Sequence, residues 1–101
     1  MRDFEFNPGY YEWHLTDKAT GELLLNIVDP FDDMFNPETG EPLSRTETDD
    51  MAYYWLEEAE RCYDEGEPFN GVLPDSDPLD EDEKKKAAAM IADTLYNHYI
   101  A

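Results

Sequence analysis

The sequence predicts an α+β fold, in which an N-terminal three-stranded antiparallel meander precedes a long acidic loop and two helices packed on the sheet. Residues 1–30 contain short runs of alternating apolar and polar residues separated by turn formers, the pattern of half-buried strands. Two later segments carry apolar residues at helical spacing. With 101 residues and 41% hydrophobic composition, the chain is expected to form one domain, residues 1–101, around a single core.

The meander is predicted from alternation and turn chemistry. Strands are expected around residues 4–6 and 11–16, with a turn at 7–9 that has the sequence Asn-Pro-Gly. After a loop at 17–21, residues 23–28 form a third strand that is apolar on both faces. Such a strand lies in the centre of a sheet or is covered on both sides.

Residues 29–43 lack periodicity and contain three prolines, so they are predicted to form a loop. Residues 36–40 should make a tight turn that exposes Glu38 and Glu41. Three apolar side chains are spaced to pack this loop onto the core: Phe31, Met34 and Phe35.

The first helix is predicted over residues 46–65. Two pairs have the spacing of a capping box, Ser44 with Glu47 and Thr46 with Asp49, and Gly66 followed by Pro68 is a strong stop signal. The residues expected to be buried are Ala52, Trp55, Leu56, Ala59, Cys62 and Tyr63.

The second helix is predicted to begin at Pro78, with Asp77 as N-cap, and to end near Tyr99. The residues expected on its inward face are Ala87, Met90, Ile91, Thr94, Leu95 and His98.

The charge of the chain is concentrated in one segment. The whole chain has a formal net charge of −19, and residues 29–83 contain twenty acidic residues against two arginines, which gives −18. Nucleic-acid binders and proteins of anionic membranes lead with Lys and Arg, so this balance excludes both roles. No apolar run reaches the ~18 residues of a membrane span, and a single cysteine fits a reducing cytoplasm.

No constellation of residues predicts catalysis, a metal site or a cofactor. Cys62 lies on the expected core face, and neither His14 nor His98 has a companion at ligand spacing. Residues 75–80 resemble the start of an EF-hand loop, but an aspartate takes the place of the required glycine and Lys86 that of the bidentate glutamate. The chain is therefore expected not to be an enzyme.

The acidic run at 80–83 has a local explanation. Acids in a first helical turn complement the helix dipole, and three acid–lysine pairs at i,i+4 support them. The expected pairs are Asp80–Lys84, Glu81–Lys85 and Asp82–Lys86.

The outward stripe of the first helix lacks such an explanation. Asp64 and Glu65 stand at the C-terminal end, where the dipole disfavours acids, and only Glu57 with Arg61 is expected to form a helpful pair. We therefore expect the stripe and the acidic loop to bind a basic partner. The predicted partner-binding residues are Asp32, Asp33, Glu38, Glu41, Asp50, Tyr53, Tyr54, Glu57, Glu58, Glu60, Asp64 and Glu65.

The amount of charge matches that of duplex DNA. At one charge per ~1.7 Å of duplex, nineteen charges correspond to about 32 Å, close to the ~33 Å diameter of a domain of this size. In size, charge and composition the whole chain resembles phage-encoded DNA-mimic inhibitors of the anti-CRISPR and anti-restriction class. The resemblance implies binding to the basic nucleic-acid-binding surface of a bacterial defence complex, a CRISPR effector before a restriction enzyme, in the host cytoplasm.

Three other interpretations stay open at the level of sequence. An acidic adaptor or assembly protein would bind a basic cellular protein without imitating DNA. A halophilic protein would also accumulate acids, although over its whole surface. A divalent-cation binder would use the same carboxylates, and exposed tyrosines with the edge of the meander would also permit a homodimer.

Overall fold

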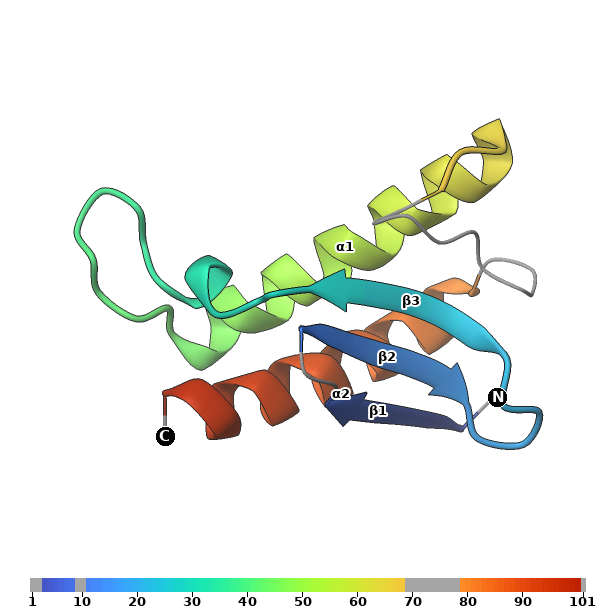
Figure 1. Cartoon of the computed structure of the whole chain (residues 1–101), viewed down its shortest axis with the longest axis horizontal. Helices are drawn as coiled ribbons and strands as arrows, with labels where there is room; N and C mark the ends of the chain where they lie inside the picture. Colours follow the sequence, from blue (N-terminus) through green and yellow to red (C-terminus); the bar gives the residue numbers. More distant parts are fainter. Residues whose placement is uncertain (1–2, 9–10, 69–78, 101) are drawn as a thin grey trace.

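The computed structural model describes residues 3–8, 11–68 and 79–100, and it has the predicted α+β architecture (Figure 1). A three-stranded antiparallel sheet is followed by a loop and two helices. The elements are β1 (Phe4–Pro8), β2 (Glu12–Asp17), β3 (Leu23–Val28), the 3₁₀ turn η1 (Asp32–Met34), α1 (Arg45–Glu65) and α2 (Glu81–Tyr99).

The sheet has the order β1-β2-β3, so β2 is its central strand. Trp13 pairs with Ile27, and Leu15 pairs with Phe6 on one side and Leu25 on the other; all five side chains are buried. The third strand was predicted to be either central or covered. It lies at an edge of the sheet, but residues 24–27 are all buried, so the second alternative is confirmed. The pairing of β2 with β3 shifts register at Leu15/Thr16. The predicted turn at 7–9 begins too early, because Asn7 and Pro8 continue β1 and pair with His14 and Trp13; Gly9 lies outside the described residues.

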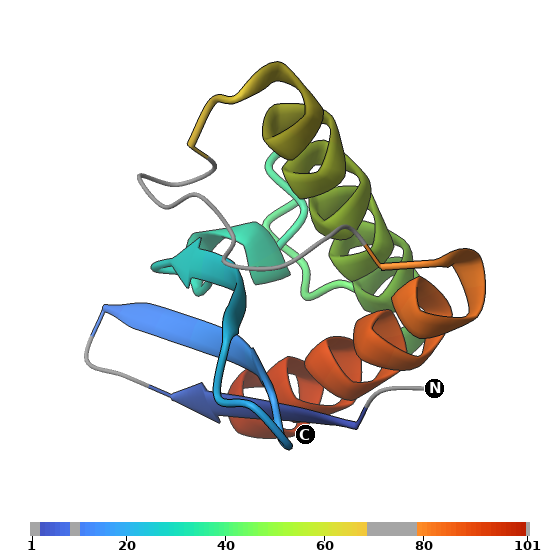
Figure 2. The same cartoon turned by 90° about the vertical axis from the view of Figure 1, so that its right-hand side faces the viewer.

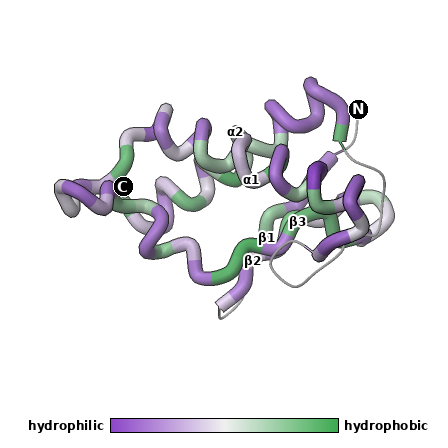
Figure 3. The backbone as a smooth tube through the Cα atoms, turned by 90° about the horizontal axis from the view of Figure 1, so that it is seen from above, coloured by the Kyte–Doolittle hydropathy of each residue, from purple (hydrophilic) through white to green (hydrophobic). Residues whose placement is uncertain are grey.

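Both helices lie on one side of the sheet, with α2 beside β1 and α1 on the side of β3 (Figures 1 and 2). The two helices contact each other, and both bury small side chains in the common core: Ala52 and Ala59 of α1 and Ala87, Ala88 and Ala92 of α2 are at most 5% exposed. Alanines allow close approach of two helices. Figure 3 shows hydrophobic and hydrophilic residues alternating along both helices, as expected for elements with one buried face.

Reciprocal capping boxes start both helices. In α1 the Ser44 side chain accepts a hydrogen bond from the Glu47 N–H while the Glu47 carboxylate accepts one from the Ser44 N–H. This confirms the first of the two predicted boxes; the alternative start at Thr46 is wrong, because Thr46 lies inside the helix. In α2 the box is formed by Asp80 and Glu83, so the predicted start at Pro78 is wrong by three residues. Asp77 and Pro78 lie outside the described residues.

The loop after β3 is anchored by Met34, which is fully buried and whose C=O accepts a 2.8 Å hydrogen bond from the Leu43 N–H. The expected turn is present, since the Gly40 N–H donates to the Asn36 C=O at 2.8 Å. Phe35 is half-buried, but Phe31 remains 48% exposed. The prediction that all three apolar side chains pack onto the core is therefore wrong for Phe31.

Most of the predicted helical core is confirmed, including buried Cys62. His98 is an exception, because it lies exposed in the last turn of α2, where its ring contacts Trp13 and Tyr99 edge-on. No helix formed by the described residues is long and apolar enough to cross a membrane.

Candidate partner-binding surface on helix α1

One flank of α1 packs along α2 and uses several of the predicted site residues internally. The Tyr53 hydroxyl donates a hydrogen bond to the Glu81 carboxylate, and Glu60 forms an ion pair with Lys84. We call these contacts, together with the ion pair between Arg45 and Asp93, the interhelical seam. Tyr53 and Glu60 were predicted to face solvent, and the structure corrects this. They lie seven residues apart, hence on the same flank of the helix, and α2 covers that flank.

The seam perturbs the titration of its members. The hydrogen bond to Glu81, burial and nearby carboxylates raise the pKa of Tyr53 to about 12. The hydrogen bond and charge of Glu60 raise the pKa of Lys84, against the opposing effect of burial. Lys84 is only 9% exposed, so its ammonium group is held inside the fold by the Glu60 carboxylate.

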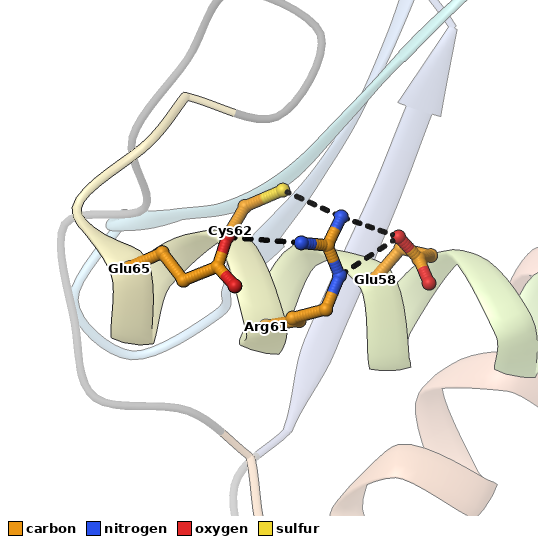
Figure 4. A network of polar contacts seen from close by, with 4 residues as sticks. All are labelled: Glu58, Arg61, Cys62 and Glu65. Atoms are coloured by element: carbon orange, nitrogen blue, oxygen red, sulfur yellow. Dashed lines mark hydrogen bonds and ion pairs between the residues drawn. The ribbon is translucent and has the colours of Figure 1, made fainter.

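Arg61 neutralises a second group of predicted site residues (Figure 4). Its guanidinium contacts Glu58 at 2.9 and 3.2 Å and Glu65 at 2.9 Å. The predicted pair with Glu57 is wrong, because Arg61 turns toward the carboxylates three residues before and four residues after it. These contacts raise the pKa of Arg61. Arg61 also offsets the unfavourable charge of Glu65 at the C-terminal end of the helix.

The lysines of α2 do not form the predicted i,i+4 pairs. Lys84 reaches across to Glu60, and Lys86 contacts Asp3 at 2.8 Å while lying over the Phe4 ring. The Lys86 contact lowers the pKa of Asp3. Long-range pairing thus replaces local pairing, because these lysines lie next to α1 and β1.

Three carboxylates on the outward side of α1 have no partner among the described side chains. Asp50, Glu57 and Asp64 are exposed, and no described side chain forms a hydrogen bond or ion pair with any of them. We call them the acidic row. They are seven residues apart, so they lie along one line of the helix at intervals of about 10.5 Å, with a drift of about 20° per interval. Tyr54, which is 59% exposed, lies between the first two.

The loop supplies a separate group of acids. Asp32 and Asp33 lie in η1, and Glu38 and Glu41 lie at the 36–40 turn, all of them exposed. Burial, and then the charges of Asp32 and Asp29, raise the pKa of Asp33. No hydrogen bond or ion pair between described residues joins these acids to the acidic row. The structure therefore divides the predicted site into an outward row, a loop group and acids committed to the fold.

The described residues contain no group of three metal-ligating side chains, and the EF-hand-like segment at 75–80 lies largely outside them. No protein-family model matches the chain, and neither a curated protein nor a solved structure matches it. The geometry and charge of the surface are thus the basis for a functional proposal.

Proposed function

We propose that this protein is a non-enzymatic inhibitor that occupies the basic nucleic-acid-binding surface of a bacterial defence complex, with a CRISPR effector preferred over a restriction enzyme. It would act in the host cytoplasm and imitate the charge of DNA. The acidic row carries the proposal, because its three carboxylates are exposed, aligned along the helix and without a hydrogen bond or ion pair to any described side chain.

The density and arrangement of charge support imitation of DNA. Row carboxylates follow one another at about 10.5 Å along a nearly straight line of the helix, so they offer the basic side chains of a nucleic-acid channel a regular series of negative charges, without following the wound path of one phosphate strand. For the whole molecule, a longest extent of 37 Å and a net charge of −19 give one charge per about 1.9 Å, against ~1.7 Å in duplex DNA.

The mechanism requires no chemical step. Long-range attraction speeds the encounter with a basic channel, after which Asp50, Glu57 and Asp64 pair with arginines and lysines that normally hold phosphates. Tyr54 adds an exposed aromatic contact of the kind found at interface hot spots. Glu58 and Glu65 contribute less, since Arg61 already contacts both.

Competition for DNA tests the proposal. Guide-loaded CRISPR effectors and a restriction enzyme are incubated with a labelled target duplex at physiological salt, and the protein is added until binding saturates. We expect the duplex to be displaced from at least one effector. The triple variant Asp50→Asn, Glu57→Gln, Asp64→Asn should lose this effect.

The matched control removes the same number of charges elsewhere. Glu5→Gln, Glu12→Gln, Glu22→Gln alters three acids of the sheet and its second turn and should retain inhibition. If both triple variants lost inhibition equally, the total charge of the protein would explain the inhibition, and the proposal would be contradicted. Tight binding to a basic protein without displacement of DNA would favour the adaptor function.

A further inference from the structure

A second exposed surface lies away from the acidic row, where β2 begins and β3 ends. Among the described residues, three of the four exposed large hydrophobic side chains belong to this region: Tyr11 at 63%, Val28 at 44% and Phe31 at 48%. Val28 pairs with Glu12 across the sheet, and the Asp29 N–H donates a 2.7 Å hydrogen bond to the Tyr11 C=O. The backbone therefore fixes these residues close together.

Phe31 is held in place although it is exposed. The Met34 N–H donates to the Phe31 C=O, and the Asp33 N–H to the C=O of buried Pro30, both at 3.1 Å. Its ring contacts Phe35 and Tyr99 edge-on, with centroids 5.2 and 5.4 Å apart. One face of a preorganised ring thus remains available, which lowers the entropic cost of binding.

Three acidic residues lie within two positions of Phe31 along the chain. Asp29, Asp32 and Asp33 are exposed, and none of them forms an ion pair with a described side chain. Burial, and then the charges of Asp32 and Asp29, raise the pKa of Asp33. A ligand for this surface must therefore present an aromatic-binding face and a positive charge together.

We propose that Phe31, flanked by Asp29, Asp32 and Asp33, is a docking surface for an arginine side chain on a basic segment of a partner protein. A guanidinium is planar and weakly hydrated, stacks on aromatic rings and forms forked hydrogen bonds with carboxylates. A lysine ammonium is compact and strongly hydrated, so it uses the ring less well. A second copy of this chain would place three carboxylates against three others.

This inference goes beyond the proposed function, because it concerns a surface outside α1 and holds for a basic partner of any activity. The probes are a capped peptide of alternating glycine and arginine and a lysine peptide of the same length. Each is titrated into the full chain at physiological salt, with affinity measured by calorimetry and the contacted residues by backbone amide shifts. We expect tighter binding of the arginine peptide, with the largest shifts around Phe31.

Phe31→Leu keeps apolar bulk but removes the aromatic face. We expect it to weaken the arginine peptide about two- to fivefold and the lysine peptide less. Phe31→Tyr keeps the face and should preserve the preference for arginine, while Asp32→Asn, Asp33→Asn should weaken both peptides. Melting curves verify that each variant folds. If Phe31→Leu does not fold, Asp32→Asn, Asp33→Asn still tests the surface, because it leaves the aromatic contacts of Phe31 intact.

Glu5→Gln, Glu22→Gln is the matched control, because it removes the same number of charges as Asp32→Asn, Asp33→Asn from residues that belong to neither proposed surface. The inference is overturned if the two peptides bind equally, if Glu5→Gln, Glu22→Gln weakens the arginine peptide as much as Asp32→Asn, Asp33→Asn does, or if Phe31→Leu instead reduces self-association in sedimentation. The variant Asp50→Asn, Glu57→Gln, Asp64→Asn should leave the arginine preference intact. Failure of the DNA-competition test and failure of this one are thereby distinguishable.

Discussion

Helix α1 has two acidic flanks that differ in what their charges contact. On the seam, Glu60 pairs with buried Lys84 and Tyr53 donates to Glu81. On the row, Asp50, Glu57 and Asp64 are exposed, and no described side chain forms a hydrogen bond or ion pair with them. Carboxylates only about 60° apart around the helix axis, such as Glu57 and Glu60, therefore have different roles, and contacts with α2 decide which role each one has.

The difference teaches that acidic composition is a poor guide to a binding surface. A carboxylate that holds a buried cation contributes to stability, and its loss leaves an uncompensated charge. An unpaired surface carboxylate on a chain of −19 adds self-repulsion instead. Substitutions on the seam should therefore change stability, whereas substitutions on the row should change binding.

Charge reversal of the row should have the largest effect. We expect Asp50→Lys, Glu57→Lys, Asp64→Lys to weaken inhibition by more than about a hundredfold, because each reversed contact replaces attraction by repulsion. The melting temperature should stay the same or rise, since self-repulsion decreases. Inhibition titrations and thermal unfolding measure both quantities. A loss of folding with this variant would show that the row is structural.

On the seam, Glu60→Gln should destabilise the fold by about 1 kcal/mol. Buried Lys84 loses its anionic partner, but solvent partly screens the pair because the Glu60 side chain is 33% exposed. Urea unfolding measures the change. Replacing both partners, Glu60→Leu with Lys84→Met, should recover much of the stability. If Glu60→Gln reduced inhibition as much as Glu57→Gln, the distinction between seam and row would be wrong.

The seam should also be visible in an alkaline titration. Absorbance of the folded protein near 295 nm should show one tyrosine ionising last, at a pKa of about 12, and Tyr53→Phe should remove that step. Because the folded pKa is raised, the contribution of Tyr53 to stability is complete below pH ~10 and is lost as the pH rises toward 12. A titration unchanged by Tyr53→Phe would contradict the assigned hydrogen bond.

Substitution in the loop group should have the smallest effect on stability. At neutral pH it should stabilise the fold, whereas substitutions on the seam destabilise it. Burial and neighbouring aspartates raise the pKa of Asp33, so the folded state favours its protonated form. That preference stabilises the fold below the usual aspartate pKa and is lost as the pH rises through the raised value. Asp33→Asn should therefore raise the melting temperature slightly at neutral pH, and the gain should vanish in acid.

The fold was largely predictable because its determinants are local. Alternation placed the strands, and the Ser44 capping box with Gly66 placed α1 within one residue. The start of α2 was less predictable, because Asp77 and Asp80 are both good N-cap residues. Only Asp80 has a glutamate three positions later, which allows the reciprocal capping box.

The site was less predictable because its determinants are not local. Glu57, Glu58 and Glu65 all lie three or four residues from Arg61, and sequence spacing does not rank them. Which flank of α1 meets α2 depends on how the alanine faces pack, and that choice removed Tyr53 and Glu60 from the exposed surface. The exposure of Phe31 likewise follows from tertiary contacts of the loop.

The caps of α1 also fix the length and alignment of the acidic row. Its N-terminal end is closed by Ser44, and its C-terminal end by Gly66 in a left-handed conformation with φ 74° whose N–H donates back to the last turn. Because the ends of the helix are well defined and its rise is regular, the distance along the axis from Asp50 to Asp64 is fixed at about 21 Å. One residue inserted between two row carboxylates would rotate those beyond it by about 100°. An inserted heptad would keep the carboxylates aligned and lengthen the row by about 10.5 Å.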